Sequence, residues 1–483
     1  MLTIEQIKSF IDNDKVSNKK RNARVGERYY EGDHDIKNYK LYYYNDDNQL
    51  IEDKNKSNIK ISHPFFTELI DQKIQYLFSG DCNFAKSKKP ELQEILDKLI
   101  NNNEDLKAEL EEVSSEASVK GFGYLYLYRD KKGKLAFQCA ETMGVVEVRA
   151  KDTQDNCDYV IYWYVDRITE DNEKIKKIQV WNDKEVYYYT QVDDGALELD
   201  SSEPINPKPH SIYTIEGNGA KFGDSFGFIP FFRLDNNRKQ VSDLKPIKAL
   251  IDDYDLMACG LSNNIQDASE YVVVVKGFEG GSLEQLDQNI RTKKRIGVGE
   301  GGDVDFRTID IPYQARQTKL ELDEKNIYRF GMGFNSAQLG DGNITNIVIK
   351  SRYALLDLKC NKFETYLRKL LRKIVEIYLD EYNAENNTAF LPEDVYFEFE
   401  REIMTNASDN AQIELTEAQK KQVEVNTLLN LASLLDNETI VRAICEILDI
   451  DYNDIKDKLP VDEEENTNNA INDLNNLTAD EVI

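Results

Sequence analysis

Apolar residues recur at helical spacing in many parts of the chain, most regularly between residues 349 and 377. The steps there alternate between four and three residues, the period of a helix that buries one face. The positions are Ile349, Tyr353, Leu356, Cys360, Phe363, Leu367, Leu370, Ile374 and Ile377. This pattern predicts one long helix over about 346–383.

Shorter helical patterns predict further helices. Ile4, Ile7, Phe10 and Ile11 indicate a charged helix over 1–30, and a second pattern over 64–78 ends where Gly80 is placed to stop it. Other helices are expected over 90–119, as one helix or a pair, and over 245–270, 314–330, 412–435 and 437–448. In 245–270 the expected apolar stripe is Leu250, Tyr254, Met257, Leu261, Ile265 and Ala268. The opposite face carries Asp252, Asp253, Asp255 and Asp267.

The period changes to two after Gly121, which indicates strands. Tyr124–Tyr128, a short polar turn and Leu135–Phe137 predict a β-hairpin. More strands are expected over 143–149, 158–166, 174–181, 184–192, 271–275, 303–311 and 395–399. The fold class is therefore α+β, with an α+β region over about 1–240 followed by a mainly helical half.

Polar and glycine-rich stretches separate these elements. We expect loops from Gly32 to about Asn58 and over 195–225, a turn at Gly297–Gly302, and a mobile loop over Gly331–Asn343. The acidic, Asn-rich end, 461–483, is expected to be disordered.

Composition narrows the class of protein. Lys and Arg total 61 against 89 Asp and Glu, a formal charge of −28, which opposes conventional binding to nucleic acid. Apolar runs are too short for a membrane helix, so no membrane partner is expected. The six cysteines are scattered singly, which favours a reducing compartment.

The predicted long helix departs from the acidic composition. Eight basic residues and two acidic ones, Asp357 and Glu364, lie within 350–373. The basic residues are Lys350, Arg352, Lys359, Lys362, Arg368, Lys369, Arg372 and Lys373. This helix needs an acidic neighbour, another subunit or DNA to balance its charge.

Residues that could carry chemistry are few. His34, His63 and His210 are not spaced to share a metal, so structural or surface roles are expected. The glycines of 297–302 lack the Gly-Lys-Ser/Thr of a phosphate-binding loop. No carboxylate pair is singled out, and we expect neither enzymatic activity nor a cofactor.

Several longer stretches are distinctive when taken together. They are Arg28–Ile36 (RYYEGDHDI), Asn58–Phe66 (NIKISHPFF), Ile70–Gly80 (IDQKIQYLFSG), Ile229–Asn237 (IPFFRLDNN), Ser242–Asp255 (SDLKPIKALIDDYD) and Leu261–Asn264 (LSNN). In this order they resemble the portal family of long-tailed phages that infect Gram-positive bacteria. The resemblance runs from residue 1 to about 460. It implies a wing over 1–240, a stem helix over 241–270, a clip over 271–311 and a second stem helix over 312–332. A tunnel loop (333–346), a long helix with a return to the wing (347–405) and a crown (406–460) follow.

The resemblance also implies a function. Identical subunits would form a closed ring, dodecameric in the virion, at the capsid vertex through which double-stranded DNA is packaged and ejected. The implied partners are the large subunit of an ATP-driven terminase, a head-completion adaptor, and the major capsid and scaffolding proteins. Assembly would take place in the cytoplasm of the host bacterium.

Three groups of residues are candidates for these roles. The channel lining is expected from Asp252, Asp255, Asp267, Asn335, Gln338, Asp341 and Asn343, and the alternative is an ordinary solvated helix face and a plain connection. The basic residues Lys350, Arg352, Lys359, Lys362 and Arg368 would pair with acidic groups of the same or another subunit, or would face DNA. Docking at the clip is expected from Arg291, Lys293, Lys294 and Arg295.

Two other classes of protein remain open at this point. One is an acidic cytosolic scaffold that oligomerises through a coiled coil at 349–377 and has no DNA role. The other is an enzyme with an unrecognised carboxylate site.

Overall fold

The fold was analysed in a computed structural model, in which two compact units are described separately. One unit comprises Met1–Gly342 and Lys350–Ile403, and the other comprises Asn343–Ile349 and Met404–Ile483. The structure describes all residues except 46, 55, 81–82, 131–132, 151–155, 170–171, 215–220, 268–271, 279–281, 283–297, 308–311, 336–345, 402–406, 432–436, 449, 451 and 453–483. The expected disordered tail, 461–483, therefore lies outside the described residues.

The chain begins with two helices, α1 (Ile4–Lys15) and α2 (Asn18–Tyr30). The prediction of a single helix over 1–30 is wrong, because Ser17 takes an extended conformation and its side chain accepts a hydrogen bond from the Lys20 amide, 3.2 Å away. Both helices still bury one face, and α2 ends where expected.

The expected polar loop up to Asn58 contains some regular structure. A 3₁₀ turn (η1, Asp35–Asn38) is followed by a short hairpin of β1 (Tyr42–Tyr44) and β2 (Leu50–Glu52). Three-residue strands fall below the length at which alternation of apolar and polar residues identifies a strand.

Three helical segments follow as predicted. They are α3 (Phe65–Leu77), α4 (Pro90–Leu96), which continues into a π-helical turn η2 (Asp97–Asn101), and α5 (Glu104–Lys120). Gly80 does not end α3, which stops at Leu77. A Cβ at Gly80 would lie 2.2 Å from the carbonyl oxygen of Glu400, so glycine is needed there for a close approach of two backbones.

The predicted hairpin is the centre of a three-stranded sheet. Its strands are β4 (Phe122–Arg129) and β5 (Leu135–Ala140), with Tyr124 opposite Ala140, and β14 (Phe231–Asp235) pairs with the other edge of β4. A second sheet has the order β10-β9-β8-β7-β6. It contains β6 (Val145–Arg149), β7 (Cys157–Ile168), β8 (Lys174–Trp181) and β9 (Glu185–Val192), close to the predicted strands.

The expected loop over 195–225 is wrong in part. It contains four short strands: β10 (Leu197–Leu199), β11 (Lys208–Pro209), β12 (Ser211–Thr214) and β13 (Lys221–Asp224). β10 and β11 extend the second sheet by pairing with β9, and β12 pairs with β13. Backbone pairing with a neighbouring strand creates these elements, and it leaves little trace in the local sequence.

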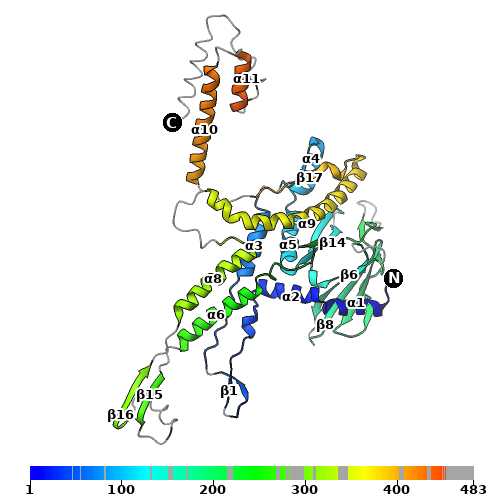
Figure 1. Cartoon of the computed structure of the whole chain (residues 1–483). Helices are drawn as coiled ribbons and strands as arrows, with labels where there is room; N and C mark the ends of the chain where they lie inside the picture. The colour runs from blue at the N-terminus through cyan, green and yellow to red at the C-terminus, as the bar shows by residue number, and fades with distance from the viewer. Residues whose placement is uncertain are drawn as a thin grey trace. The chain divides into compact units, whose positions relative to one another are not determined.

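The next segment has the predicted helix, hairpin, helix order. The helices α6 (Lys248–Asp267) and α8 (Tyr313–Gly331) lie side by side, and β15 (Val272–Phe278) pairs with β16 (Val298–Arg307) beyond their ends (Figure 1). The turn expected at Gly297–Gly302 is wrong for Val298–Gly302, which belongs to β16. A Cβ at Gly302 would lie 2.7 Å from the Lys276 carbonyl oxygen, so this glycine permits close strand pairing.

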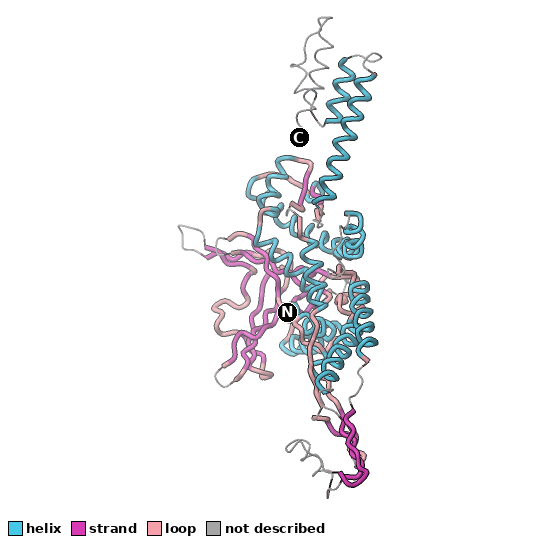
Figure 2. Tube along the Cα trace, turned by 90° about the vertical axis from the view of Figure 1, so that its left-hand side faces the viewer, coloured by secondary structure: helices cyan, strands magenta, loops and turns pink. Residues whose placement is uncertain are grey.

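The long predicted helix is α9 (Asn346–Asn386). Its apolar face from Leu356 to Leu379 forms one side of the largest core, against α3, α4, α5 and the three-stranded sheet. β17 (Val395–Phe397) then pairs with β3 (Ala85–Ser87). Figure 2 shows the strands of the two larger sheets gathered on one side of this unit and the helices on the other.

The second unit contains the two predicted C-terminal helices, α10 (Ala407–Asn430) and α11 (Asn437–Leu448), which pack against each other. The mixture of helix and sheet confirms the α+β class.

Candidate functional site

The pair of helices α6 and α8 is the most distinctive structure of the larger unit, and charged groups join its two members. The Lys319 ammonium on α8 lies 2.5 Å from the Asp253 carboxylate on α6 and also pairs with Asp323. Arg316 packs over Gly260, where a Cβ would lie 2.9 Å from its guanidinium. The two helices are therefore joined by an ion pair as well as by apolar contacts.

A regular ladder of hydrogen bonds fixes α6 against the extended segment 57–63. Every fourth side chain of α6 accepts from every second backbone amide of the segment. The bonds join Ser57 N to Asp267 Oδ1 (3.2 Å), Ile59 N to Asn263 Oδ1 (2.7 Å), Ile61 N to Cys259 Sγ (3.2 Å) and His63 N to Asp255 Oδ1 (3.0 Å). Four residues of helix advance about 6 Å and two residues of extended chain advance about 6.6 Å, so the two spacings match along the ladder.

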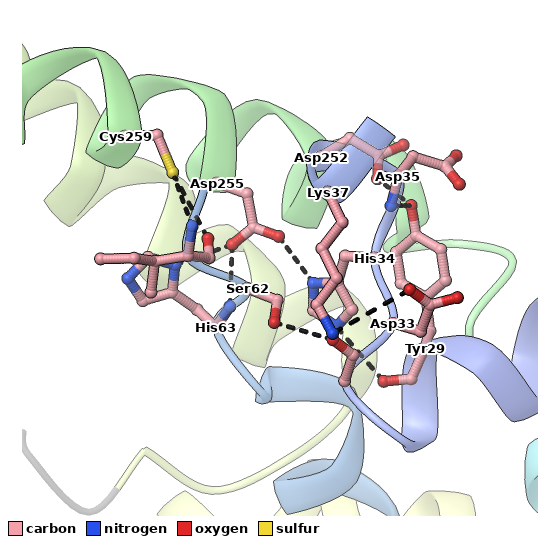
Figure 3. A network of polar contacts seen from close by, with 12 residues as sticks. Tyr29, Asp33, His34, Asp35, Lys37, Ser62, His63, Asp252, Asp255 and Cys259 are labelled. Carbon is pink, nitrogen blue, oxygen red and sulfur yellow. Dashed lines mark hydrogen bonds and ion pairs between the residues drawn. The ribbon is translucent and has the colours of Figure 1, made fainter. Parts of the chain in front are cut away.

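Asp255 ends this ladder in a buried cluster with two histidines (Figure 3). Its carboxylate lies 2.6 Å from His34 Nδ1 and 2.7 Å from His63 Nδ1, and both Asp255 and His34 are fully buried. Burial acts to raise the pKa of Asp255, but the hydrogen bonds from His34 and His63 outweigh it and the pKa is lowered. The ring of His34 also stacks on Tyr29, with 4.5 Å between the ring centroids.

These contacts correct two expectations for α6. Asp255 cannot line a channel, because its side chain is closed off inside its own subunit. The expected apolar stripe is also wrong, since the residues buried on α6 are Ile251, Asp255 and Cys259, whereas Ile265 is exposed. The buried face is partly polar because it meets the backbone of segment 57–63.

The other two candidate acids of α6 stay partly exposed but are engaged. Asp267 accepts the Ser57 amide described above. Asp252 accepts from the Tyr29 hydroxyl and lies 2.7 Å from the Lys248 ammonium, which also pairs with Asp35 at 2.6 Å.

The start of the glycine-rich loop after α8 is firmly docked. Gly333 lies so close to Leu69 on α3 that a Cβ would be 2.0 Å from its side chain. Gln72 bonds both the amide and the carbonyl of Phe334, at 3.0 and 2.8 Å, and Phe334 stacks on Tyr353. Over Gly331–Asn335, the expectation of a mobile backbone is therefore wrong: glycine serves close packing there.

Of the loop's candidate residues, Asn335 is described, and its amide donates to Glu324 on α8. Gln338, Asp341 and Asn343 lie outside the described residues, and so do the clip candidates Arg291, Lys293, Lys294 and Arg295. Their proposed roles remain predictions.

A buried polar junction connects the end of α8 to α9. Lys359 donates to the Gly331 carbonyl (2.9 Å) and pairs with Asp243 (3.2 Å), and the buried Lys73 ammonium lies 3.0 Å from the same carboxylate. Burial acts to raise the pKa of Asp243, but the charges of Lys359 and Lys73 outweigh it and the pKa falls well below its usual value.

The remaining basic candidates on α9 divide by environment. Arg368 pairs with Glu364, which Arg401 also contacts. Lys350 and Lys362 are exposed, and Arg352 is half-buried. Lys359 thus pairs within its own subunit, which is one of the possibilities that the sequence left open.

The apolar stripe of α9 excludes the coiled-coil scaffold. From Leu356 to Ile374 its side chains are buried in the core of their own chain, so they are not available to a partner helix.

Sequence reasoning missed the ladder and the buried junction. The run Asp255, Cys259, Asn263, Asp267 at intervals of four was a usable signal for the ladder, because it places hydrogen-bonding groups in one line on a helix. The partners of Lys73, by contrast, are far away in sequence and leave no local pattern.

Other chemistry finds little support in the described part of the chain. There, no three His, Cys, Asp or Glu side chains are arranged to hold a metal ion. Within the same limits, every helix is too short or too polar to cross a bilayer. All three histidines have structural contacts. His34 and His63 contact Asp255 as described above, and His210 Nε2 lies 2.9 Å from the Asn182 carbonyl oxygen.

Comparison with known proteins supplies the family. The model described as "Phage portal protein, SPP1 Gp6-like" matches residues 10–457. This chain belongs to that family. It is 29% identical over 349 residues to the portal protein of Bacillus phage SPP1, covering 72% of this chain and 67% of that protein. It is 24% identical over 399 residues to the portal protein of Clostridium phage phiCD119, covering 78% and 82% respectively.

Membership confirms the resemblance found in the sequence. The chain is a phage portal protein, a structural and non-enzymatic component, and a role in DNA packaging follows from the family. The family also implies an oligomeric ring at a capsid vertex, with DNA and packaging proteins as partners.

Proposed function

We propose that twelve copies of this chain form the ring and that α6 and α8 are its stem, surrounding the DNA. The observation that carries this proposal is the antiparallel pair α6–α8 with the hairpin β15–β16 beyond it, joined to a sheet-containing body and to α9. A closed ring needs a heterologous interface, and elements that project from a compact body offer one.

The remaining segments take the other portal roles in this proposal. The α+β body over 1–240 is the wing, 271–311 is the clip, 333–346 is the tunnel loop and 406–460 is the crown. Support comes from the order of the elements, which follows the order that the family resemblance implied. The buried junction at Lys359 connects the second stem helix to the long helix, so a displacement of one helix would be transmitted to the other.

The channel wall is proposed to guide DNA without binding it tightly. Asp252 and Asp253 are each paired with a lysine of the same helix pair, which reduces the negative potential around the two carboxylates. The whole chain has a formal net charge of −28. Charges act over about 8 Å at physiological salt, so phosphates near the wall meet weak and local forces. Asp267, Asn335 and the undescribed loop residues Gln338, Asp341 and Asn343 are the further lining candidates.

The partners follow from the same proposal. The large subunit of an ATP-driven terminase would dock on the clip, where Arg291, Lys293, Lys294 and Arg295 are candidates, because this sequence has no phosphate-binding loop of its own. A head-completion adaptor, the major capsid protein and a scaffolding protein complete the set. The ring would assemble in the host cytoplasm and remain at the portal vertex of the virion.

Electron cryomicroscopy of the purified protein tests the proposal directly. We expect closed rings with α6 and α8 around an axial channel wide enough for a DNA duplex. Rings whose channel is lined by the sheets of the body, or protein that stays monomeric at every concentration, would contradict it.

A further inference from the structure

The hairpin β1–β2 exposes an unusual amount of apolar surface. Its large side chains are all accessible: Tyr42 is 54% exposed, Tyr43 44%, Tyr44 68%, Leu50 58% and Ile51 40%. Together they expose a few hundred Å² of side-chain surface, the size of patch that marks interaction sites on soluble proteins. A two-stranded hairpin without such packing is marginally stable in water.

Both faces of this hairpin are apolar. The register places Tyr44 opposite Leu50 and Tyr43 opposite Ile51. Neighbouring residues of a strand point to opposite faces, so each of these pairs covers a different face. A flat surface can cover only one of these faces, so covering both requires contacts on two sides of the hairpin.

The base of the hairpin is held in place by its own subunit. Asn58 donates to the Tyr39 carbonyl at 3.3 Å, Lys60 donates to the Lys37 carbonyl at 3.0 Å, and the ladder fixes 57–63 along α6. We call residues 39–56 the arm. In Figure 1 the arm, labelled at β1, projects beside the α6–α8 pair with its tip free of that pair.

We propose that the arm of one copy packs against the α6–α8 pair of the next copy in the ring. This inference rests on the proposed ring. A heterologous interface joins two different surfaces of one chain, and α6–α8 also exposes apolar side chains. They are Leu256 and Ile265 on α6 and Tyr313 and Leu322 on α8. Residues nine apart on a helix point about 180° apart, so these side chains are divided between two faces of the pair.

The exposed apolar area of the arm is large enough to form part of an interface with a second copy. A stable interface covers about 800 Å² on each partner, so the arm supplies a substantial share and the bodies of adjacent subunits supply the rest. Apolar burial is also the contribution that survives high salt, which suits a particle made of strongly acidic subunits.

Photo-cross-linking between isotopically distinct copies tests the contact. The photoreactive residue p-benzoylphenylalanine replaces Tyr44 in light protein, which is assembled with heavy-labelled wild-type protein. We expect light arm peptides joined to heavy peptides from Lys248–Asp267 or Tyr313–Gly331. The same replacement at Tyr396, exposed on β17, is the matched control and should yield no such adduct. Adducts confined to one isotopic form, or adducts of the arm with other proteins alone, overturn the inference.

A double substitution separates this inference from the ring itself. Tyr44→Ser with Leu50→Ser should raise the protein concentration at half-assembly at least tenfold, measured by mass photometry, while the circular dichroism spectrum is unchanged. Tyr396→Ser with Leu391→Ser, two comparably exposed residues, should leave it unchanged. If wild-type rings form and the arm variant assembles equally well, the arm contact is wrong and the ring stands. If wild-type protein never forms rings, the proposed function and this inference fail together.

Discussion

At the scale of single side chains, Asp255 links His34 and His63 to α6. Its two carboxylate oxygens accept from His34, His63 and the His63 amide, so both oxygens are engaged inside the protein. A carboxylate in this setting positions α6 relative to η1 and segment 57–63. Its charge is not available to DNA.

Substitution of Asp255 by Asn should destabilise the folded subunit by about 3 kcal/mol, because one histidine then meets an amide NH₂ group in a buried site. Chemical denaturation at fixed protein concentration and pH 7 measures the change. Asp253→Asn is the matched control, since that carboxylate is 44% exposed and makes a surface ion pair, for which less than about 1 kcal/mol is expected.

The difference in stability between wild type and Asp255→Asn should also depend on pH. Because the folded-state pKa of Asp255 is lowered, its stabilisation is fully present above the unfolded-state pKa, about 3.9, and is lost as the pH falls through the lower folded-state value. The stability gap between wild type and Asp255→Asn should therefore be present at pH 5 and shrink below pH 4. A gap that is independent of pH would show that Asp255 is not ionised in the folded protein.

At the scale of elements, the ladder makes α6 and segment 57–63 one mechanical unit. Each rung is a single side-chain to backbone bond, and the matched spacing lets four of them form without bending either element. The base of the arm is thereby fixed to α6 of its own subunit. Movement of α6 during DNA passage would be transmitted to the arm.

Removing one rung should loosen the segment locally. Asn263→Ala deletes the acceptor of the Ile59 amide, a bond of about 1 kcal/mol, so amides over 57–63 should exchange with deuterium about five times faster. Asn264→Ala is the control, because the neighbouring residue points about 100° away on the helix. Equal exchange in both variants would mean that the rung does not hold the segment.

The elements that sequence patterns predicted are those that bury one regular face. The nine-residue stripe of α9 and the alternation in β4 and β5 reflect burial against a single core, and their limits came within a few residues. Strands β10 to β13 are two to four residues long and depend on a partner elsewhere in the chain. At the candidate site, Asp252, Asp255 and Asp267 look alike in sequence, and the fold alone separates the buried one from the others.

At the scale of the whole molecule, the chain combines a strongly acidic composition with one basic surface. On α9 the side chains of Lys362, Lys369, Arg372 and Lys373 are exposed, whereas Lys359 and Arg368 are paired within the subunit. Acidic copies repel one another, and a ring brings them together. A basic strip on each copy, set against the acidic surface of its neighbour, would reduce that repulsion.

Ring assembly should therefore depend on salt and on this strip. Raising the ionic strength from about 0.1 to 1 M shortens the screening length from about 10 to 3 Å, which weakens the attraction of the strip as well as the repulsion between acidic copies. Replacing Lys369, Arg372 and Lys373 by Gln removes up to about 1 kcal/mol for each pair and leaves the repulsion, so assembly at low salt should weaken about tenfold or more and added salt should then strengthen it. Neutralising three exposed lysines outside α9, Lys88, Lys98 and Lys174, is the matched control and should leave both unchanged. If the α9 variant assembles normally yet packages less DNA, the strip faces DNA and not a neighbouring subunit, because a lost contact between copies would already weaken assembly of the empty ring.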